Sequence, residues 1–334
     1  MCTLVVLHRC VPDRPLVVAA NRDEFLDRPS EDFAIRDSRN GPILSPLDLE
    51  AGGTWVGLNQ RGVFAGLTNL RPLSAAQKDE SGESETDSSS SSPANELKSR
   101  GGVVTAALEA ESAADAVRQL SLLEEDSYNP FQLLVADGRD AFLIVYRGRA
   151  RVVELEPGPH IVGNVEDEKV AAKLGVAALL KQEVERERTA VQSGEQIEYP
   201  GFAGVSMIDT QEPRALKLTR IRERVEKMVT EPEHDLFEGL ARVCREHVDG
   251  EGIVSPFEAT CVHLTSKPSV REQEGNSVQT GGEQIRYGTR SSLLLELSRD
   301  PGLSRFWATD GPPCERPFEN RSVLLKDLGV RLGD

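Results

Sequence analysis

The sequence predicts an α+β protein in which helical layers cover β-sheets. Short apolar, β-branched runs occupy both ends of the chain, and longer stretches with helical periodicity occupy its middle. Each layer has an apolar face that must be buried against another layer, which favours sheets packed against helices. The 334 residues, 38% of them hydrophobic, are enough for a sizeable core. No internal repeat or obvious linker divides the sequence, so we expect one domain over residues 1–334.

The first 155 residues alternate between strand-like and helix-like segments. Four β-branched runs, CTLVVLH, PLVVAAN, TWVGLN and GVFAGLTN, are separated by turn-forming residues and predict strands. Helical sequence follows at residues 101–125, where we expect Ser112 to cap a second helix with Asp115 three positions later. Residues 131–155 predict a three-strand meander with Asp-Gly and Arg-Gly turns.

The second half of the chain begins helical and ends strand-like. Helical periodicity predicts helices at residues 166–188, 215–229 and 235–247. Strands are expected at residues 259–266, 284–297, 303–310 and 319–326.

The segment at residues 73–99 differs in composition from the rest of the chain. It is rich in Ser, Asp and Glu and nearly devoid of large apolar residues, so burial cannot offset the entropy of ordering it. We expect a disordered acidic, serine-rich insertion. The simplest interpretation is a tolerated surface insertion, and the alternative is a phosphorylation or docking segment.

Charge and cysteine content exclude several classes of protein. A formal net charge of −16 argues against partners bound through their phosphates, so we expect no nucleic-acid partner. Five cysteines without a CxxC pair imply neither a disulfide framework nor a zinc ribbon. No apolar stretch is long enough to cross a bilayer or to serve as a signal peptide. We therefore expect a cytoplasmic protein, whose oligomeric state the sequence leaves open.

Cys2 is the main candidate for chemistry, because it directly follows the initiator methionine. Removal of Met1 would give Cys2 both a thiol and a free α-amino group. That amine has an ordinary pKa of about 7.7–8.0, so it could accept the thiol proton near neutral pH. Such a centre needs a carboxylate to hold the amine, positive charge to favour the thiolate, and donors for an oxyanion. The alternative interpretation is a small apolar residue that begins a buried strand.

Polar side chains at the ends of strand-like runs could supply these three supports. A hairpin between residues 3 and 20 would return the ANRDE segment to the start of the chain, which makes Asp23 the strongest candidate carboxylate. The other candidates lie in or beside strand-like runs; they are Asn21, Arg22, Asn69, Asn164 and Arg290. Each also has a structural interpretation, because Asn and Asp satisfy backbone groups at turns and an exposed Arg contributes little.

Metal binding is the other chemistry that the sequence suggests. Cys244 and His247 are three positions apart on a predicted helix, and Cys261 and His263 are two apart on a predicted strand, so each pair could share a face. This spacing matches no standard zinc pattern. We therefore expect no metal and no cofactor.

Five segments together resemble a known family: MCTLVVL, LVVAANRDEFLDRP, GGTWVGLNQRGVFAGLTN, GPHIVGN and YGTRSSLLLEL. They resemble the NRDE-motif family, also called the Transport and Golgi organization protein 2 family. The resemblance covers most of the chain outside the acidic insertion and parts of the central helical region. It implies a four-layer αββα sandwich of the N-terminal-nucleophile hydrolase type, similar to penicillin V acylase and bile salt hydrolase, in which a terminal cysteine attacks a non-peptide amide.

The resemblance also implies roles for individual residues. Cys2 matches the nucleophile, Asp23 the aspartate that holds its amine, and Arg290 an arginine beside the thiol. Asn69 and Asn164 match the polar side chains near the oxyanion.

The chain departs from the acylase pattern at one position. That pattern has an arginine three residues before its aspartate, where this chain has Ala20; the arginine here is Arg22. Because neighbouring residues of a strand face opposite sides, Arg22 and Asp23 are not both expected to address the thiol. Two hypotheses therefore remain: an amide hydrolase that works through a thioester, and a non-catalytic protein that binds haem or a lipid or acyl ligand on the same fold.

Overall fold

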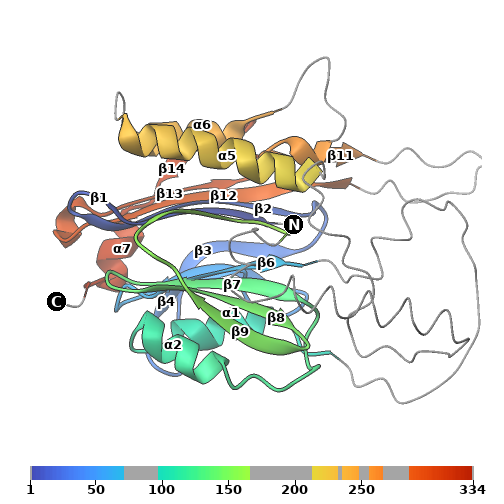
Figure 1. The fold of residues 1–334 in the computed structure, drawn as a ribbon, viewed down its shortest axis with the longest axis vertical. Helices are drawn as coiled ribbons and strands as arrows, with labels where there is room; N and C mark the ends of the chain where they lie inside the picture. The colour runs from blue at the N-terminus through green and yellow to red at the C-terminus, as the bar shows by residue number, and fades with distance from the viewer. Residues whose placement is uncertain are drawn as a thin grey trace, which may run out of the picture.

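The computed structural model describes residues 2–70, 97–165, 213–231, 235–247, 256–265 and 286–332. It confirms the α+β class, because the described strands form two seven-stranded antiparallel sheets with helices packed on them (Figure 1). Residues 73–96 of the expected insertion and the helix expected at residues 166–188 lie outside the described residues.

The first sheet contains the start of the chain near its centre. Its strands run in the order β10 (Gly158–Val162), β1 (Cys2–Val11), β2 (Arg14–Phe25), β12 (Arg286–Leu297), β13 (Arg305–Asp310) and β14 (Glu319–Asn320), and β11 (His263–Thr265) also pairs with β12. The expected hairpin is confirmed, since β1 and β2 pair with Cys2 opposite Arg22. The start of the chain is thereby held next to the NRDE segment.

The second sheet follows the chain from strand to strand. Its order is β3 (Ser30–Arg36), β4 (Ile43–Asp48), β5 (Val56–Asn59), β6 (Phe64–Asn69), β7 (Phe131–Ala136), β8 (Ala141–Arg147) and β9 (Arg149–Glu154). The expected meander at residues 131–155 is confirmed as β7, β8 and β9. Strands β3 and β4 were not expected, because polar and charged residues interrupt their apolar pattern.

Helices pack on the outer face of each sheet, as Figure 1 shows. Helices α1 (Gly101–Leu108) and α2 (Ala113–Leu120) lie on the second sheet, and α5 (Pro213–Thr230) and α6 (Leu236–Arg245) lie on the first. The Ser112 cap is confirmed, because its side chain accepts the backbone N–H of Asp115 at 3.1 Å. Two short 3₁₀ turns lie at Pro256–Glu258 and Pro301–Leu303.

Alternation along β1 and β2 decides which side chains can reach the space between the sheets. Leu4 and Val18 belong to the apolar cluster between the two sheets, whereas Val5 and Ala19 pack against α5 and α6. A third cluster joins the second sheet to α1 and α2. Because side chains alternate, Cys2 lies on the same side of β1 as Leu4.

The expected strand at residues 319–326 is wrong for most of its length. Only Glu319–Asn320 form a strand, and the apolar part of the segment belongs to helix α7 (Val323–Leu328), which ends at Gly329 in the left-handed conformation. Buried Leu325 and Leu328 are one helical turn apart and join the cluster between the sheets. A short apolar run has the same pattern in a buried strand and in a short helix, and packing decided for the helix here.

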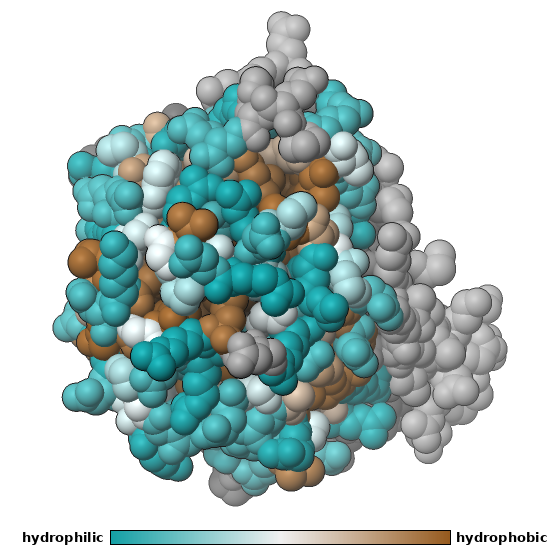
Figure 2. Space-filling view, turned by 90° about the vertical axis from the view of Figure 1, so that its left-hand side faces the viewer, coloured by the Kyte–Doolittle hydropathy of each residue, from teal (hydrophilic) through white to brown (hydrophobic). Residues whose placement is uncertain are grey.

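One face of the molecule is mostly polar. Figure 2 shows a mainly hydrophilic face on which apolar side chains gather in small, separated groups. No helix within the described ranges is long and apolar enough to span a membrane.

Candidate active site

A pocket of about 620 Å³ opens beside Cys2 where strands of both sheets end. Four of the residues proposed from the sequence line it together with Cys2: Arg22, Asp23, Asn69 and Arg290. Residues 97–101 also line it, so the described end of the expected acidic insertion borders the pocket. The structure thus brings together residues that are up to 288 positions apart in the chain.

The backbone nitrogen of Cys2 is held by a side chain from the neighbouring strand. Leu4 pairs with Val162, so continuing this antiparallel register places Asn164 level with Cys2. The Cys2 N–H donates to Asn164 Oδ1 at 3.2 Å, and Asn164 Nδ2 donates to the carbonyl oxygen of Asn69 at 2.6 Å. Asn164 does not line the pocket. Its side-chain amide therefore connects the start of β1 in the first sheet to the end of β6 in the second sheet.

Asp23 is buried on the side of the sheet that faces helix α5. It is 1% exposed, and its Oδ1 accepts a hydrogen bond from Thr289 Oγ1 at 2.6 Å. Burial raises the pKa of Asp23, while the positive charge of Lys217 acts in the lowering direction. The carboxylate therefore interacts with a cation of helix α5.

Arg22 lies opposite Cys2 in the strand pairing and faces the space between the sheets. Its Nη2 is 3.4 Å from Asp48 Oδ2 and 3.9 Å from Glu24 Oε2. Asp48 also accepts from Arg28 Nε at 2.7 Å, so the two arginines share one carboxylate. Arg22 and Asp23 thus approach Cys2 from different sides of the strand, as alternation predicts.

Burial disfavours the thiolate form of Cys2. Burial is the largest influence and raises the pKa of Cys2; the amino terminus and Arg22 lower it, and Asp23 raises it. A nucleophilic role for this thiol therefore needs a base that removes its proton.

Arg290 occupies an irregular position in β12, where the pairing with β2 shifts between Thr289 and Ser291. The shift turns Arg290 toward the pocket, where its Nη1 donates to Asp310 Oδ1 at 2.8 Å. A bulge of this kind redirects a side chain that regular pleating would place elsewhere.

Asn21, like Asn164, is a proposed residue that does not line the pocket. Its Nδ2 donates to the carbonyl oxygens of Cys244 and Thr260, each at 2.9 Å, and its Oδ1 accepts from Ser292 Oγ at 2.7 Å. These contacts tie β2 to β12, to helix α6 and to the segment before β11. Asn21 is a structural residue in this arrangement.

Sequence reasoning did not single out several cations of the site, among them Lys217 and Arg100. Lys217, in the first turns of α5, is 3% exposed and interacts with Asp23; its position inside the apolar run ALKLTRI was the available signal. Arg100 lines the pocket, and its Nη1 donates to the carbonyl of Pro130 at 3.4 Å. Burial lowers the pKa of Arg100, and the charge of Cys2 acts in the opposite direction. No sequence signal distinguished Arg100 from other arginines.

Comparisons with known proteins identify related sequences. The sequence profile described as Transport and Golgi organisation 2 matches residues 1–306. The Homo sapiens Transport and Golgi organization protein 2 homolog is 34% identical over 158 residues, which are 45% of this chain and 50% of that protein. The Mus musculus homolog is 52% identical over 61 residues, 17% of this chain and 22% of that protein. The matching part of the chain thus spans half or less of these curated relatives.

A solved structure shows the same fold at low sequence identity. A variant of conjugated bile acid hydrolase from Clostridium perfringens superposes with a TM-score of 0.50 and 11% identity, covering 99% of this chain and 95% of that one. At this identity the likeness concerns the fold alone. The profile match, in contrast, extends over most of the sequence, and the chain belongs to the Transport and Golgi organisation 2 family.

Proposed function

We propose that this protein is a cysteine N-terminal-nucleophile hydrolase that cleaves a non-peptide amide on a four-layer αββα sandwich. The observation that carries the proposal is the position of Cys2, which lines the pocket while Asn164 holds its backbone nitrogen at 3.2 Å. The stacking of helices, two sheets and helices in Figure 1 and the likeness to the bile acid hydrolase fold support the architecture.

The proposed reaction begins after removal of Met1. The α-amino group of Cys2 accepts the thiol proton, and the sulfur attacks the amide carbonyl carbon, so that a C–S bond forms and the carbonyl oxygen becomes an oxyanion. The intermediate collapses when the C–N bond breaks, and the α-ammonium group returns the proton to the leaving amine. The product of this half-reaction is a thioester on Cys2.

The second half-reaction clears the thioester with water. The α-amino group accepts a proton from a water molecule, and the resulting hydroxide attacks the thioester carbonyl. The C–S bond then breaks, the carboxylic acid leaves, and the thiol regains its proton.

The surrounding residues fit distinct roles in this scheme. We assign Asp23 to hold the α-ammonium form, because it lines the pocket and directly follows Arg22, the residue that pairs with Cys2. Asn69 lines the pocket, and we assign its side-chain amide as an oxyanion donor. Asn164 is a positioning residue, because its amide is engaged with Cys2 and with the Asn69 carbonyl. Arg22 contributes positive charge on the thiol side.

The pocket also indicates a substrate class. Arg22 and Arg28 share Asp48, and Arg290 pairs with Asp310, but among the described residues no carboxylate pairs with Arg100. A partly buried guanidinium without a counter-ion favours an anionic ligand, and Arg binds carboxylates with bidentate geometry. We therefore expect the amide substrate to carry a carboxylate or a similar anionic group.

The test compares Cys2→Ala with Cys10→Ala, which removes a second cysteine from the same strand. Intact mass should show loss of Met1, and limiting iodoacetamide followed by peptide mapping should label Cys2 when the pH is raised. In a screen of acyl amides, Cys2→Ala should lose at least about 10³-fold in rate, as expected for loss of a nucleophile, whereas Cys10→Ala keeps its rate. Retained Met1, or turnover by Cys2→Ala, would refute the enzyme and favour haem or acyl binding.

A further inference from the structure

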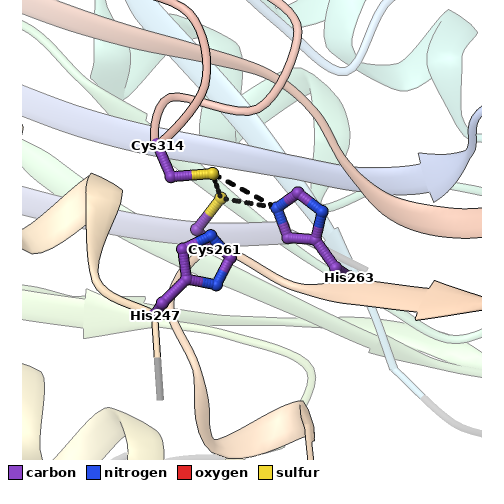
Figure 3. Close-up of side chains that lie close together, drawn as sticks. All are labelled: His247, Cys261, His263 and Cys314. Carbon is purple, nitrogen blue, oxygen red and sulfur yellow. Dashed lines mark hydrogen bonds between the residues drawn. The ribbon is translucent and has the colours of Figure 1, made fainter. Parts of the chain in front are cut away.

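Four metal-ligating side chains meet outside the pocket, on the helix side of the first sheet. His247 lies two residues beyond α6, Cys261 and His263 lie at the start of β11, and Cys314 lies in the segment after β13. One ligand atom from each residue falls within 4.8 Å of all the others. Figure 3 shows the two sulfur atoms and the ring of His263 facing one another, with His247 beside Cys261.

The separations within this cluster are those of a small tetrahedral site. The sulfur atoms of Cys261 and Cys314 are 3.5 Å apart, and His263 Nε2 is 3.5 Å from the first and 3.3 Å from the second. In a tetrahedral zinc site, Zn–S bonds of about 2.3 Å and Zn–N bonds of about 2.0–2.1 Å place ligand sulfurs about 3.8 Å apart and sulfur and nitrogen about 3.6 Å apart. Shifts of a few tenths of an ångström would therefore bring these three atoms to zinc-binding distances.

We propose that His247, Cys261, His263 and Cys314 bind one Zn²⁺ ion. Two thiolates and two imidazoles form a soft, four-ligand set, which favours zinc over the oxygen-seeking cations Mg²⁺ and Ca²⁺. Four protein ligands leave no open position for a substrate or a water molecule, so the site is structural and not catalytic.

The surroundings of His263 match those of a zinc ligand. Its Nε2 faces the two sulfurs, and its other ring nitrogen, Nδ1, is 3.8 Å from Glu315 Oε1. Histidines that bind a metal through one nitrogen usually direct the other toward a carboxylate, which fixes the orientation of the ring. Glu315 directly follows Cys314, so one short segment supplies both a ligand and this orienting carboxylate.

The sequence interpretation paired His247 with Cys244, so it did not assemble the four-residue set proposed here. Cys244 is 2% exposed and packs in the apolar cluster between α6 and the first sheet, so it cannot join the cluster. Cys314 takes its place from 67 positions farther along the chain than His247. Only the fold brings this ligand to the other three.

The ion would connect three separate segments: the end of α6, the start of β11 and the segment that follows β13. Close packing already fixes β11 on β12, since a Cβ atom at Gly288 would lie 2.4 Å from the carbonyl oxygen of Val262. Cys261 and His263 flank Val262 in the chain, so this contact holds both ligands in place. The binding energy of zinc therefore adds to the stability of the native state, as is usual for structural sites.

The experiment measures the metal content of the full-length protein purified under reducing conditions, with or without added zinc. We expect about one zinc per chain in the wild type. Cys314→Ser should reduce this to a small fraction, and Cys10→Ser, which removes a partly exposed cysteine elsewhere in the first sheet, should leave it unchanged. Cobalt substituted for zinc in the wild type should give thiolate charge-transfer absorption and the intense visible bands of tetrahedral coordination.

A measurement on the wild type alone covers the case in which Cys314→Ser does not fold. A chelator should lower its melting temperature, and added zinc should restore it. The proposal is overturned if reduced protein takes up no zinc, if Cys314→Ser retains the metal, or if cobalt shows octahedral spectra. A Cys261–Cys314 disulfide that persists in reducing buffer and prevents metal uptake would also overturn it.

Discussion

Replacing Asn164 with alanine removes the contact on which the geometry of the start of β1 depends. The wild-type amide accepts the Cys2 N–H at 3.2 Å and donates to the Asn69 carbonyl at 2.6 Å, and Asn164 is 7% exposed. Alanine makes neither bond, and its small side chain leaves the partners in place. Two buried or partly buried backbone groups therefore lose a partner at once.

The size of the effect follows from these two bonds. Each net hydrogen bond contributes about 0.5–1.5 kcal/mol, and a buried group left without a partner costs about 1–3 kcal/mol. Water from the adjacent pocket can solvate part of the exposed site, so we expect the free energy of unfolding to fall by about 2–4 kcal/mol. The matched control is Asn40→Ala, which removes an exposed 2.9 Å hydrogen bond to the Glu109 carbonyl and should change stability by less than about 0.5 kcal/mol.

Equilibrium denaturation in urea measures both variants, because the midpoint shifts while the slope stays constant if only stability changes. The rate at which iodoacetamide labels Cys2, relative to Cys10, provides a second readout of local geometry. If Asn164→Ala costs no more than Asn40→Ala and leaves the labelling ratio unchanged, the bridge from Cys2 to Asn69 does not exist in solution.

Two further predictions concern the other polar groups of the pocket. Burial raises the pKa of Asp23 above its ordinary 3.8, so the native state binds a proton on this carboxyl group more tightly than the unfolded state does. The free energy of unfolding that Asp23 contributes is therefore lost as the pH rises through the native pKa. Thermal melts from about pH 4 to about pH 7 should therefore show Asp23→Asn gaining stability relative to wild type as the pH rises, and parallel curves would contradict this sign. Asn69→Ala should lower kcat/KM by about 10²–10³ but leave the melting temperature nearly unchanged, unlike Asn164→Ala; a large drop in stability with intact turnover would reverse the roles of the two asparagines.

Strand alternation and turn residues in the sequence predicted the part of the site that lies on the neighbouring strands β1 and β2. The hairpin that brings Asp23 back to Cys2 followed from two apolar runs separated by a short polar turn, and the pairing of Cys2 with Arg22 confirms it. Alternation then separated Arg22 from Asp23 correctly. These features lie within 25 residues, where strand period and turn chemistry restrict the geometry.

Such local patterns could not predict contacts between segments that are far apart in the sequence. Arg100, Lys217 and Cys314 reach their partners only because helices and loops are placed over particular strands. Arg290 shows a different limit, since the shift in β12 that turns it into the pocket has no distinctive sequence mark. The prediction for α7 was wrong for a third reason, because a six-residue segment is too short to distinguish helical from strand periodicity.

Thr289 links the proposed zinc site to the proposed active site. Its hydroxyl donates to Asp23 Oδ1 at 2.6 Å and accepts the N–H of Val262 at 2.9 Å, and Val262 lies between the two ligands Cys261 and His263. A threonine hydroxyl has one hydrogen, so the Val262 contact leaves that hydrogen directed at Asp23. An ion that fixes residues 261–263 would therefore also fix the carboxylate that we expect to hold the Cys2 amine.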